Sequence, residues 1–159
     1  MQMGADIRLQ NPRELCGEHV ADIAVQAAPL RGTAIGSDVA LRAIDEIPVL
    51  AVAAAFAQGE TRITGVRELR TKESDRVAAI ERLLTAAGIA VESLPNGIAI
   101  CGGTPRTTGG EIVTHGDHRT AMAAAVMAAG AGALAIDDVS SVEVSFPGFV
   151  EILDWAQHQ

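Results

Sequence analysis

The residues with the most obvious chemical potential form the run 69–76, which reads Leu-Arg-Thr-Lys-Glu-Ser-Asp-Arg. The run leads into a predicted helix, and Lys72 and Arg76 lie one turn apart. A helix N-terminus offers free N–H groups and partial positive charge, so these cations could hold an anionic substrate group there. The simpler interpretation is a solvated helix start in which Glu73 and Arg76 form a weak surface ion pair.

A second polar group stands at the N-terminus of an alanine-rich helix, a position that we call the helix mouth. Asp117 is the predicted N-cap there, and Arg119 follows. An arginine beside an apolar helix cannot be buried unpaired. Arg119 therefore either reaches into a polar cleft or pairs with a neighbouring carboxylate. His115 and His118 could suggest a metal, but no third ligand is evident in the sequence, so we predict no metal site.

A third group precedes another apolar helix, where Asp45 and Glu46 come just before Pro48. Partial burial raises the pKa of a carboxylate, which would suit a general acid or base. The alternative is ordinary capping before a proline in the first helical turn. Both interpretations stay open at the level of the sequence.

The elements that must position these groups alternate between strands and helices. The apolar helices at 48–57 and 121–129 have no polar face, which predicts that both are buried all round. We therefore expect apolar helices in the middle and sheets outside. The remaining predicted elements are strands at 5–9, 22–27, 61–66, 111–114 and 133–136, a hairpin at 89–94 and 97–101, an amphipathic helix at 74–87 with Thr71 or Ser74 as its N-cap, and a helix at 149–157.

The chain also contains a predicted internal repeat, at approximately 45–88 and 117–157. Each copy runs from an alanine-rich helix through a strand to a second helix. In this alignment Asp45 and the segment from Asp117 to Arg119 occupy equivalent helix mouths. Equivalent mouths in a duplicated fold can face one cleft.

Composition limits the classes of partner. The 159 residues are 48% apolar and carry a net charge of −8, which fits one globular domain or a large piece of one. The acidic balance argues against nucleic-acid and membrane surfaces, so any anion needs a local basic cluster. Cys16 and Cys101 form no paired motif, and no signal peptide or membrane span is evident. We expect a soluble, cytoplasmic protein.

Four motifs together resemble the 5-enolpyruvylshikimate-3-phosphate (EPSP) synthase family. The run 69–76 is similar to that family's L-R-x-K-E-S/T-D-R signature, and 117–123 to its D-H-R-x-A-M motif. Residues 45–48 are similar to its carboxylate-bearing helix mouth, and 145–147 to its S/T-F-P element. The motifs come in family order across almost the whole chain.

The resemblance implies an α/β fold, an inside-out α/β barrel of βαβαββ repeats with buried helices and outer sheets. It implies that residues 1–159 are the C-terminal portion of a longer protein, one incomplete domain. It also implies transfer of the carboxyvinyl group of phosphoenolpyruvate to the 5-hydroxyl of shikimate 3-phosphate, with no metal or organic cofactor. Most residues that hold shikimate 3-phosphate would lie in the N-terminal domain, so we expect the chain alone to have at most weak phosphoenolpyruvate affinity and no turnover.

Carried over by position, the resemblance implies that Arg76 and Arg119 hold the phosphate and carboxylate of phosphoenolpyruvate. Lys72 would lie beside the target hydroxyl, where it adds positive charge as the oxygen nucleophile develops. Asp45 would contact that hydroxyl as candidate general base, and Glu73 would be a candidate proton donor to the methylene carbon. Which carboxylate does which is left open.

One position departs from the family pattern. Many members have a lysine before the S/T-F-P element, whereas this chain has Val144, so one phosphate-binding charge is missing. The resemblance allows inhibitors of the glyphosate type. Two other interpretations stay open: an enolpyruvyl transferase acting on a nucleotide sugar such as UDP-N-acetylglucosamine, and a non-catalytic repeat module that keeps the scaffold.

Overall fold

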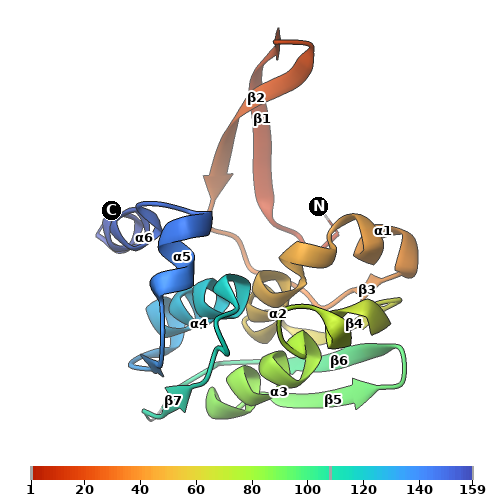
Figure 1. Ribbon diagram of the computed structural model, residues 1–159. Helices are drawn as coiled ribbons and strands as arrows, with labels where there is room; N and C mark the ends of the chain where they lie inside the picture. Colours follow the sequence, from red (N-terminus) through yellow and green to blue (C-terminus); the bar gives the residue numbers. More distant parts are fainter. Residues whose placement is uncertain (1, 108, 159) are drawn as a thin grey trace.

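The computed structural model describes residues 2–107 and 109–158 as a mixed α/β assembly (Figure 1). The predicted unit 1–159 also includes positions 1, 108 and 159, which lie outside the described residues. The elements follow one another as β1 (Asp6–Leu15), β2 (Glu18–Gln26), β3 (Ala34–Ile35), α1 (Ser37–Arg42), η1 (Ile44–Glu46), α2 (Ile47–Ala55), β4 (Gly59–Thr64), η2 (Arg67–Thr71), α3 (Arg76–Ala86), β5 (Ala90–Leu94), β6 (Gly97–Gly102), β7 (Glu111–Ile112), α4 (His118–Ala131), β8 (Ala135–Ile136), α5 (Ser140–Ser145) and α6 (Phe149–Gln157).

Helices α2 and α4 pack side by side in the middle of the molecule. Their alanines allow close approach, and Ala51, Ala54 and Ala124 are fully buried between their neighbours. The prediction that both helices are buried all round is wrong on one side. Val49 keeps 42% of its surface exposed, because this side of α2 borders a cavity rather than another element.

A four-stranded sheet in the order β3-β4-β6-β5 packs against α2 and α3. Strands β4, β5 and β6 are antiparallel neighbours, and β3 is parallel to β4. Ile63, Ile98 and Ile100 point to the inner face, where α2 and the amphipathic α3 exclude water from them. The predicted hairpin at 89–94 and 97–101 is thus confirmed, within one residue at each outer end.

Helix α3 begins two residues later than predicted, and its N-cap is neither Thr71 nor Ser74. The cap is Asp75, whose side chain accepts a hydrogen bond from the Ala78 N–H. Thr71 and Ser74 use their hydroxyls elsewhere. At the other end of α3, Gly88 has a φ of 72° and closes the helix with a Schellman-type pair of main-chain bonds.

Gly102 ends β6 against the last turn of α2. A Cβ atom at this position would lie 2.2 Å from the Ala57 carbonyl oxygen and 2.3 Å from that of Ala54. Both distances are far below van der Waals contact. The absence of a side chain at Gly102 therefore lets the sheet and α2 approach at this point.

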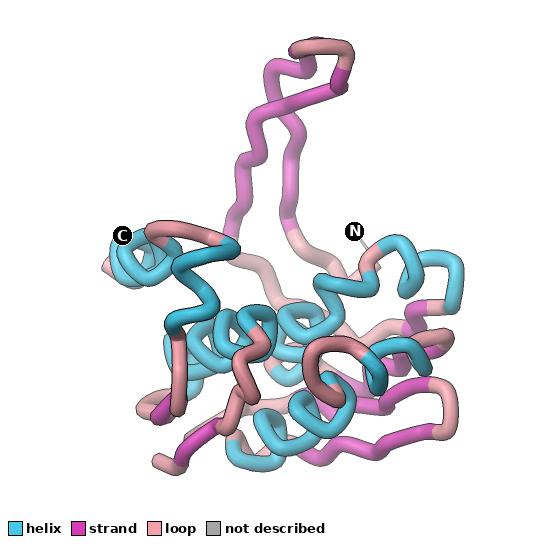
Figure 2. Tube along the Cα trace, viewed as in Figure 1, coloured by secondary structure: helices cyan, strands magenta, loops and turns pink. Residues whose placement is uncertain are grey.

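The β1–β2 hairpin projects from the rest of the chain and is visible as an isolated pair of strands (Figure 2). The predicted strands at 5–9 and 22–27 are too short, because the ladder continues past a bulge between Gln10 and Arg13 to a tight turn. The bulge accommodates Pro12, which lacks a donor for the ladder. Leu9, Ile23 and Val25 are exposed on the hairpin.

Beyond the sheet, a second strand-helix-strand unit is formed by β7, α4 and β8, with β7 parallel to β8. Both strands are shorter than predicted, and α5 was not predicted because its serines and acidic residue give no apolar periodicity. The first unit, β3-α2-β4, has the same parallel geometry. Common origin of the two units stays a prediction.

The described sheets are open at their edges. Residues 2–107 and 109–158 form sheets of two, four and two strands, and these do not close into a barrel. The expected α/β class with central helices is present. The inside-out barrel is not confirmed.

Candidate active site

Three segments far apart in the sequence meet at the carboxylate of Asp45. Its Oδ1 lies 2.8 Å from Arg76 Nη1 and 3.9 Å from Lys72 Nζ, and its Oδ2 lies 3.7 Å from Arg119 Nη2. Asp45 belongs to η1, Lys72 follows η2, and the two arginines stand at the first turns of α3 and α4. The structure therefore brings the three predicted cations around one point.

Arg76 is the most buried of the three cations, with 1% of its side chain exposed. Its Nε donates to Asp117 Oδ2 at 2.8 Å, its Nη1 to Asp45 Oδ1 at 2.8 Å, and its Nη2 to Glu73 Oε2 at 2.7 Å. Burial alone would lower the pKa of Arg76, but the carboxylates of Asp117, Asp45 and Glu73 together outweigh it and raise the pKa above its ordinary value. The interpretation of Glu73 and Arg76 as an isolated surface ion pair is therefore wrong.

Asp117 is fully buried and hydrogen-bonds to groups of two helices, α3 and α4. It caps α4, as predicted, because Oδ1 accepts from the main-chain N–H groups of Arg119 and Thr120. Oδ2 accepts from Arg76 Nε and from the hydroxyl of Ser74. Burial raises the pKa of Asp117, but these hydrogen bonds outweigh it and hold the pKa below its usual value.

Asp45 has a lowered pKa as well, which corrects the expectation that partial burial would raise it. Burial does act in that direction, but the hydrogen bond from Arg76 and the charges of Arg119 and Lys72 outweigh it. Asp45 is therefore ionised at neutral pH. In this state it can accept a proton and cannot donate one.

Arg119 and Lys72 also have partners other than the carboxylate of Asp45. Arg119 Nη1 donates to the Asp45 carbonyl at 2.9 Å and to Glu46 Oε1 at 3.1 Å, and 30% of its side chain stays exposed. Lys72 Nζ lies 3.0 Å from Glu68 Oε1. Arg119 and Lys72 are therefore more accessible than Arg76.

Carboxylates outnumber cations in the cluster. The ion pairs join Lys72, Arg76 and Arg119 to five acidic residues, which are Asp45, Glu46, Glu68, Glu73 and Asp117. An incoming anion must displace one or more of the exposed carboxylates before it can contact an arginine fork. The displaced carboxylates would then lie beside the ligand, where they could accept or donate protons.

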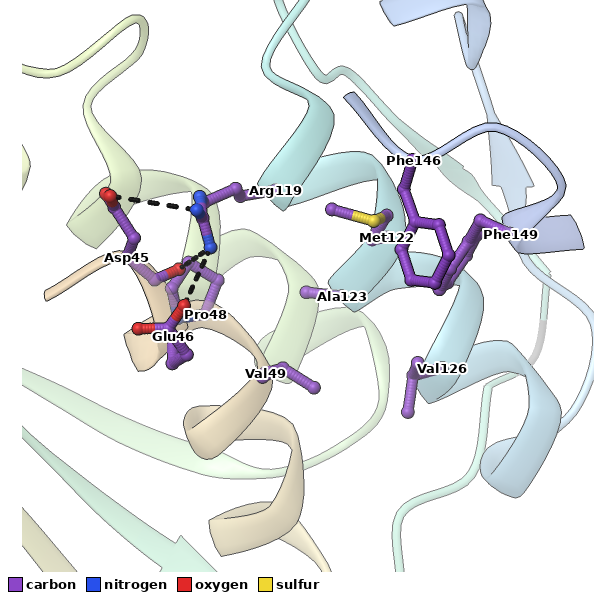
Figure 3. Close-up of a pocket in the computed structure, with 10 residues that line it drawn as sticks. All are labelled: Asp45, Glu46, Pro48, Val49, Arg119, Met122, Ala123, Val126, Phe146 and Phe149. Carbon is purple, nitrogen blue, oxygen red and sulfur yellow. Dashed lines mark hydrogen bonds and ion pairs between the residues drawn. The ribbon is translucent and has the colours of Figure 1, made fainter. Parts of the chain in front are cut away.

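A cavity of about 210 Å³ opens beside the charged cluster (Figure 3). Asp45, Glu46 and Arg119 form its polar end. The opposite walls are apolar and come from α2, α4, the C-cap of α5 and the start of α6. The residues are Pro48, Val49, Met122, Ala123, Val126, Phe146 and Phe149. Lys72 and Arg76 are not among the residues that line it.

Sequence reasoning identified the cluster but missed some of its partners. It treated Asp117 only as a cap, and it did not pair Ser74 with Asp117 or Glu46 with Arg119. No local spacing signals these contacts, since 43 positions separate Ser74 from Asp117. Val144, at the position where many family members have lysine, lies exposed on α5.

The described residues include neither a metal-binding group nor a membrane-spanning helix. Within residues 2–107 and 109–158, no three His, Cys, Asp or Glu side chains are grouped so that they could hold a metal ion. In the same part of the chain, every helix is too short or too polar to cross a bilayer.

Comparisons with known proteins agree on one family. Residues 1–153 match the model of "EPSP synthase (3-phosphoshikimate 1-carboxyvinyltransferase)". A 3-phosphoshikimate 1-carboxyvinyltransferase from Alkalilimnicola ehrlichii is 52% identical over 94% of this chain and 34% of its own length. The EPSP synthase structure from Acinetobacter baumannii is 39% identical, with a TM-score of 0.91 over 97% of this chain and 36% of that one.

A more distant structure has the same fold. The enolpyruvyl transferase NikO from Streptomyces tendae is 21% identical, with a TM-score of 0.65 over 95% of this chain and 32% of that one. The chain spans about a third of the length of the curated relatives it matches.

Proposed function

The chain belongs to the EPSP synthase family, and from this premise we propose that it carries the phosphoenolpyruvate side of an EPSP synthase active site. The reaction transfers the carboxyvinyl group of phosphoenolpyruvate to the 5-hydroxyl of shikimate 3-phosphate and releases phosphate. The observation that supports this proposal most strongly is the meeting of Lys72, Arg76 and Arg119 at Asp45. Phosphoenolpyruvate has a carboxylate and a phosphate. The guanidinium of an arginine presents parallel N–H donors in one plane, an arginine fork, and two such forks suit these two groups.

In the proposed complex, the anion binds where exposed carboxylates now occupy the arginine forks. Asp45 and Glu73 hold the outer nitrogens of Arg76, and both are partly exposed, so they can turn away. Asp117 is buried and stays on Nε. Arg119 gives up Glu46 in the same way. Each exchange replaces a carboxylate oxygen by a substrate oxygen, which keeps the guanidinium hydrogen bonds satisfied.

The chemistry then needs one base and one acid. Asp45, ionised and close to Lys72, accepts the proton of the 5-hydroxyl as its oxygen attacks C2 of phosphoenolpyruvate. Glu73 delivers a proton to the methylene carbon, and the product of this addition is a tetrahedral intermediate. Glu73, now a carboxylate, removes a proton from the new methyl group as the bond from C2 to the phosphate oxygen breaks, which restores the double bond and releases phosphate. Lys72 stabilises the negative charge that develops on the attacking oxygen.

The excess of carboxylates in the cluster supports a further part of the proposal, that this chain alone binds phosphoenolpyruvate weakly and does not turn it over. A trianion is opposed by the acidic residues that it must displace. We propose that shikimate 3-phosphate is held mostly by the N-terminal domain typical of the family, and that the complete domain has the inside-out barrel. Further cations from that domain would shift the balance toward anion binding.

Titration of the ¹⁵N-labelled chain with phosphoenolpyruvate, followed by nuclear magnetic resonance, tests the proposal. We expect saturable shifts in residues 45–46, 72–76 and 117–119 at millimolar ligand. Replacing Arg119 by alanine removes a fork and should raise the dissociation constant at least about tenfold. The matched control is Arg62→Ala, which removes an arginine from an exposed pair on β4 and should leave the constant unchanged.

Two outcomes would contradict the proposal. One is equal weakening by Arg62→Ala and Arg119→Ala, which would indicate only general attraction to positive charge. The other is turnover of phosphoenolpyruvate and shikimate 3-phosphate by the isolated chain at ordinary enzyme rates, which would show that the site needs nothing more.

A further inference from the structure

Asp117 stands at the junction of the two helix mouths. One oxygen accepts the Arg119 main-chain N–H at 2.9 Å, and the other accepts Arg76 Nε at 2.8 Å. The carboxylate therefore contacts the residues that carry both forks, one through the main chain and one through the side chain.

The contact with Arg76 is directional. Asp117 occupies the side of the guanidinium formed by Nε, at 2.8 Å, and Nη2, which donates to its Oδ1 at 3.4 Å. Nη1 and Nη2 also donate to the partly exposed Asp45 and Glu73. This outward edge has two parallel donors, which is the geometry that binds a planar or tetrahedral oxyanion through two hydrogen bonds. When an anion displaces Asp45 and Glu73, Asp117 is the carboxylate among these contacts that still holds the guanidinium in this orientation.

Ser74 completes the arrangement from the loop before α3. Its hydroxyl donates to Asp117 Oδ2 at 2.9 Å, the same oxygen that accepts from Arg76 Nε. The hydroxyl thereby fixes the rotation of the carboxylate. The buried carboxylate accepts five hydrogen bonds from four residues, which restricts its movement, and a positioning group needs such rigidity.

We infer that Asp117, oriented by Ser74, is a positioning residue that sets the direction of the Arg76 fork and the place of Arg119 for anion binding. The inference rests on the proposed function, because the anion it serves is phosphoenolpyruvate. It adds a role for a carboxylate that need not touch the substrate.

The test compares Asp117→Asn with Asp75→Asn, which alters the N-cap of the neighbouring helix α3. Asparagine can still cap α4 through its carbonyl oxygen, but it carries no charge for Arg76 Nε. In the labelled chain, we expect Asp117→Asn to speed exchange of the Arg76 Nε proton with solvent and to weaken phosphoenolpyruvate binding, each about tenfold. Asp75→Asn should change neither by more than about twofold.

A second pair of variants keeps the test valid if Asp117→Asn does not fold. Ser74→Ala removes the hydroxyl and should give smaller effects in the same direction, whereas Ser74→Thr keeps the hydroxyl and should restore both readouts. A general loss of stability would not be rescued selectively in this way.

The inference is overturned if a folded Asp117→Asn chain keeps both the slow Arg76 Nε proton and the original affinity. It is also overturned if Ser74→Ala and Ser74→Thr behave alike. If the unaltered chain does not bind phosphoenolpyruvate, the proposed function fails, and proton exchange alone then decides whether Asp117 and Ser74 hold Arg76.

Discussion

The mouths of α3 and α4 share a sequence pattern but differ in what the arginine does. Each has an aspartate as N-cap, Asp75 in α3 and Asp117 in α4, with an arginine in the first turn. At α3 the cap is exposed and Arg76 is buried in a network of carboxylates. At α4 the cap is buried and Arg119 is partly exposed. The difference shows that the local sequence does not decide which arginine is held in place. Arg76 of α3 is fixed because the buried cap of the other helix, Asp117, binds its side chain.

The largest contrast should come from removing each arginine in turn. Arg76→Met leaves the buried Asp117 without its charged partner, which we expect to lower the free energy of unfolding by about 3–5 kcal/mol. Arg119→Met breaks partly exposed pairs and should cost about 1 kcal/mol or less. Urea unfolding followed by circular dichroism measures both. Equal costs would show that the two mouths do not differ in this way.

The two caps provide the next contrast. Asp75→Ala removes one hydrogen bond at an exposed helix start and should cost about 1 kcal/mol. Asp117→Ala removes a cap and also leaves Arg76 Nε and the Ser74 hydroxyl without their acceptor, so its cost should be about 3 kcal/mol. Thermal unfolding of the two variants in the same buffer makes the comparison. A smaller loss for Asp117→Ala than for Asp75→Ala would contradict it.

Acid should affect the buried cap through its pKa. Because the folded-state pKa of Asp117 lies below its unfolded value, its contribution to stability is complete above the unfolded pKa and is lost as pH falls through the folded one. The lowered pKa of Asp45 acts in the same direction. We therefore expect the stability difference between the unaltered chain and Asp117→Asn to shrink as pH is lowered from 7 toward 2. A difference that grows in acid would reverse the assigned direction.

The smallest effect should come from Lys72, which belongs to neither helix. In the ion pair of Lys72 with Glu68, the Glu68 side chain is exposed. Glu68→Ala should therefore change the free energy of unfolding by less than about 1 kcal/mol. The same variant removes a competing carboxylate from Lys72, and phosphoenolpyruvate binding should improve slightly. Parallel unfolding and titration experiments check both, and weaker binding would count against a role for Lys72.

Much of the arrangement could be predicted because it depends on local patterns. The apolar stretches of α2 and α4, the alternation of β4 and the cap at Asp117 follow from neighbouring residues alone. The convergence of the charged segments was expected from the repeat and from family motifs, although local spacing carries no such information.

The features that could not be predicted depend on contacts between distant segments. The pKa of Asp45 is lowered by cations from two other segments, so the direction of the shift was not available from the residues around position 45. The length of the β1–β2 hairpin depends on a bulge that allows the ladder to pass Pro12. The start of α3 shifted because Ser74 is used by Asp117, a residue in another helix.

The close approach of Gly102 to the last turn of α2 has a consequence for the opposite end of that helix. Even one added methyl group would have to push the main chain at Ala54 or Ala57 aside. Helix α2 continues directly from η1, which contains Asp45, to this contact. A shift of its last turn would therefore move the whole helix and with it Asp45. A substitution at a glycine without any charge could thus disturb the electrostatics of the cluster from the far end of a helix.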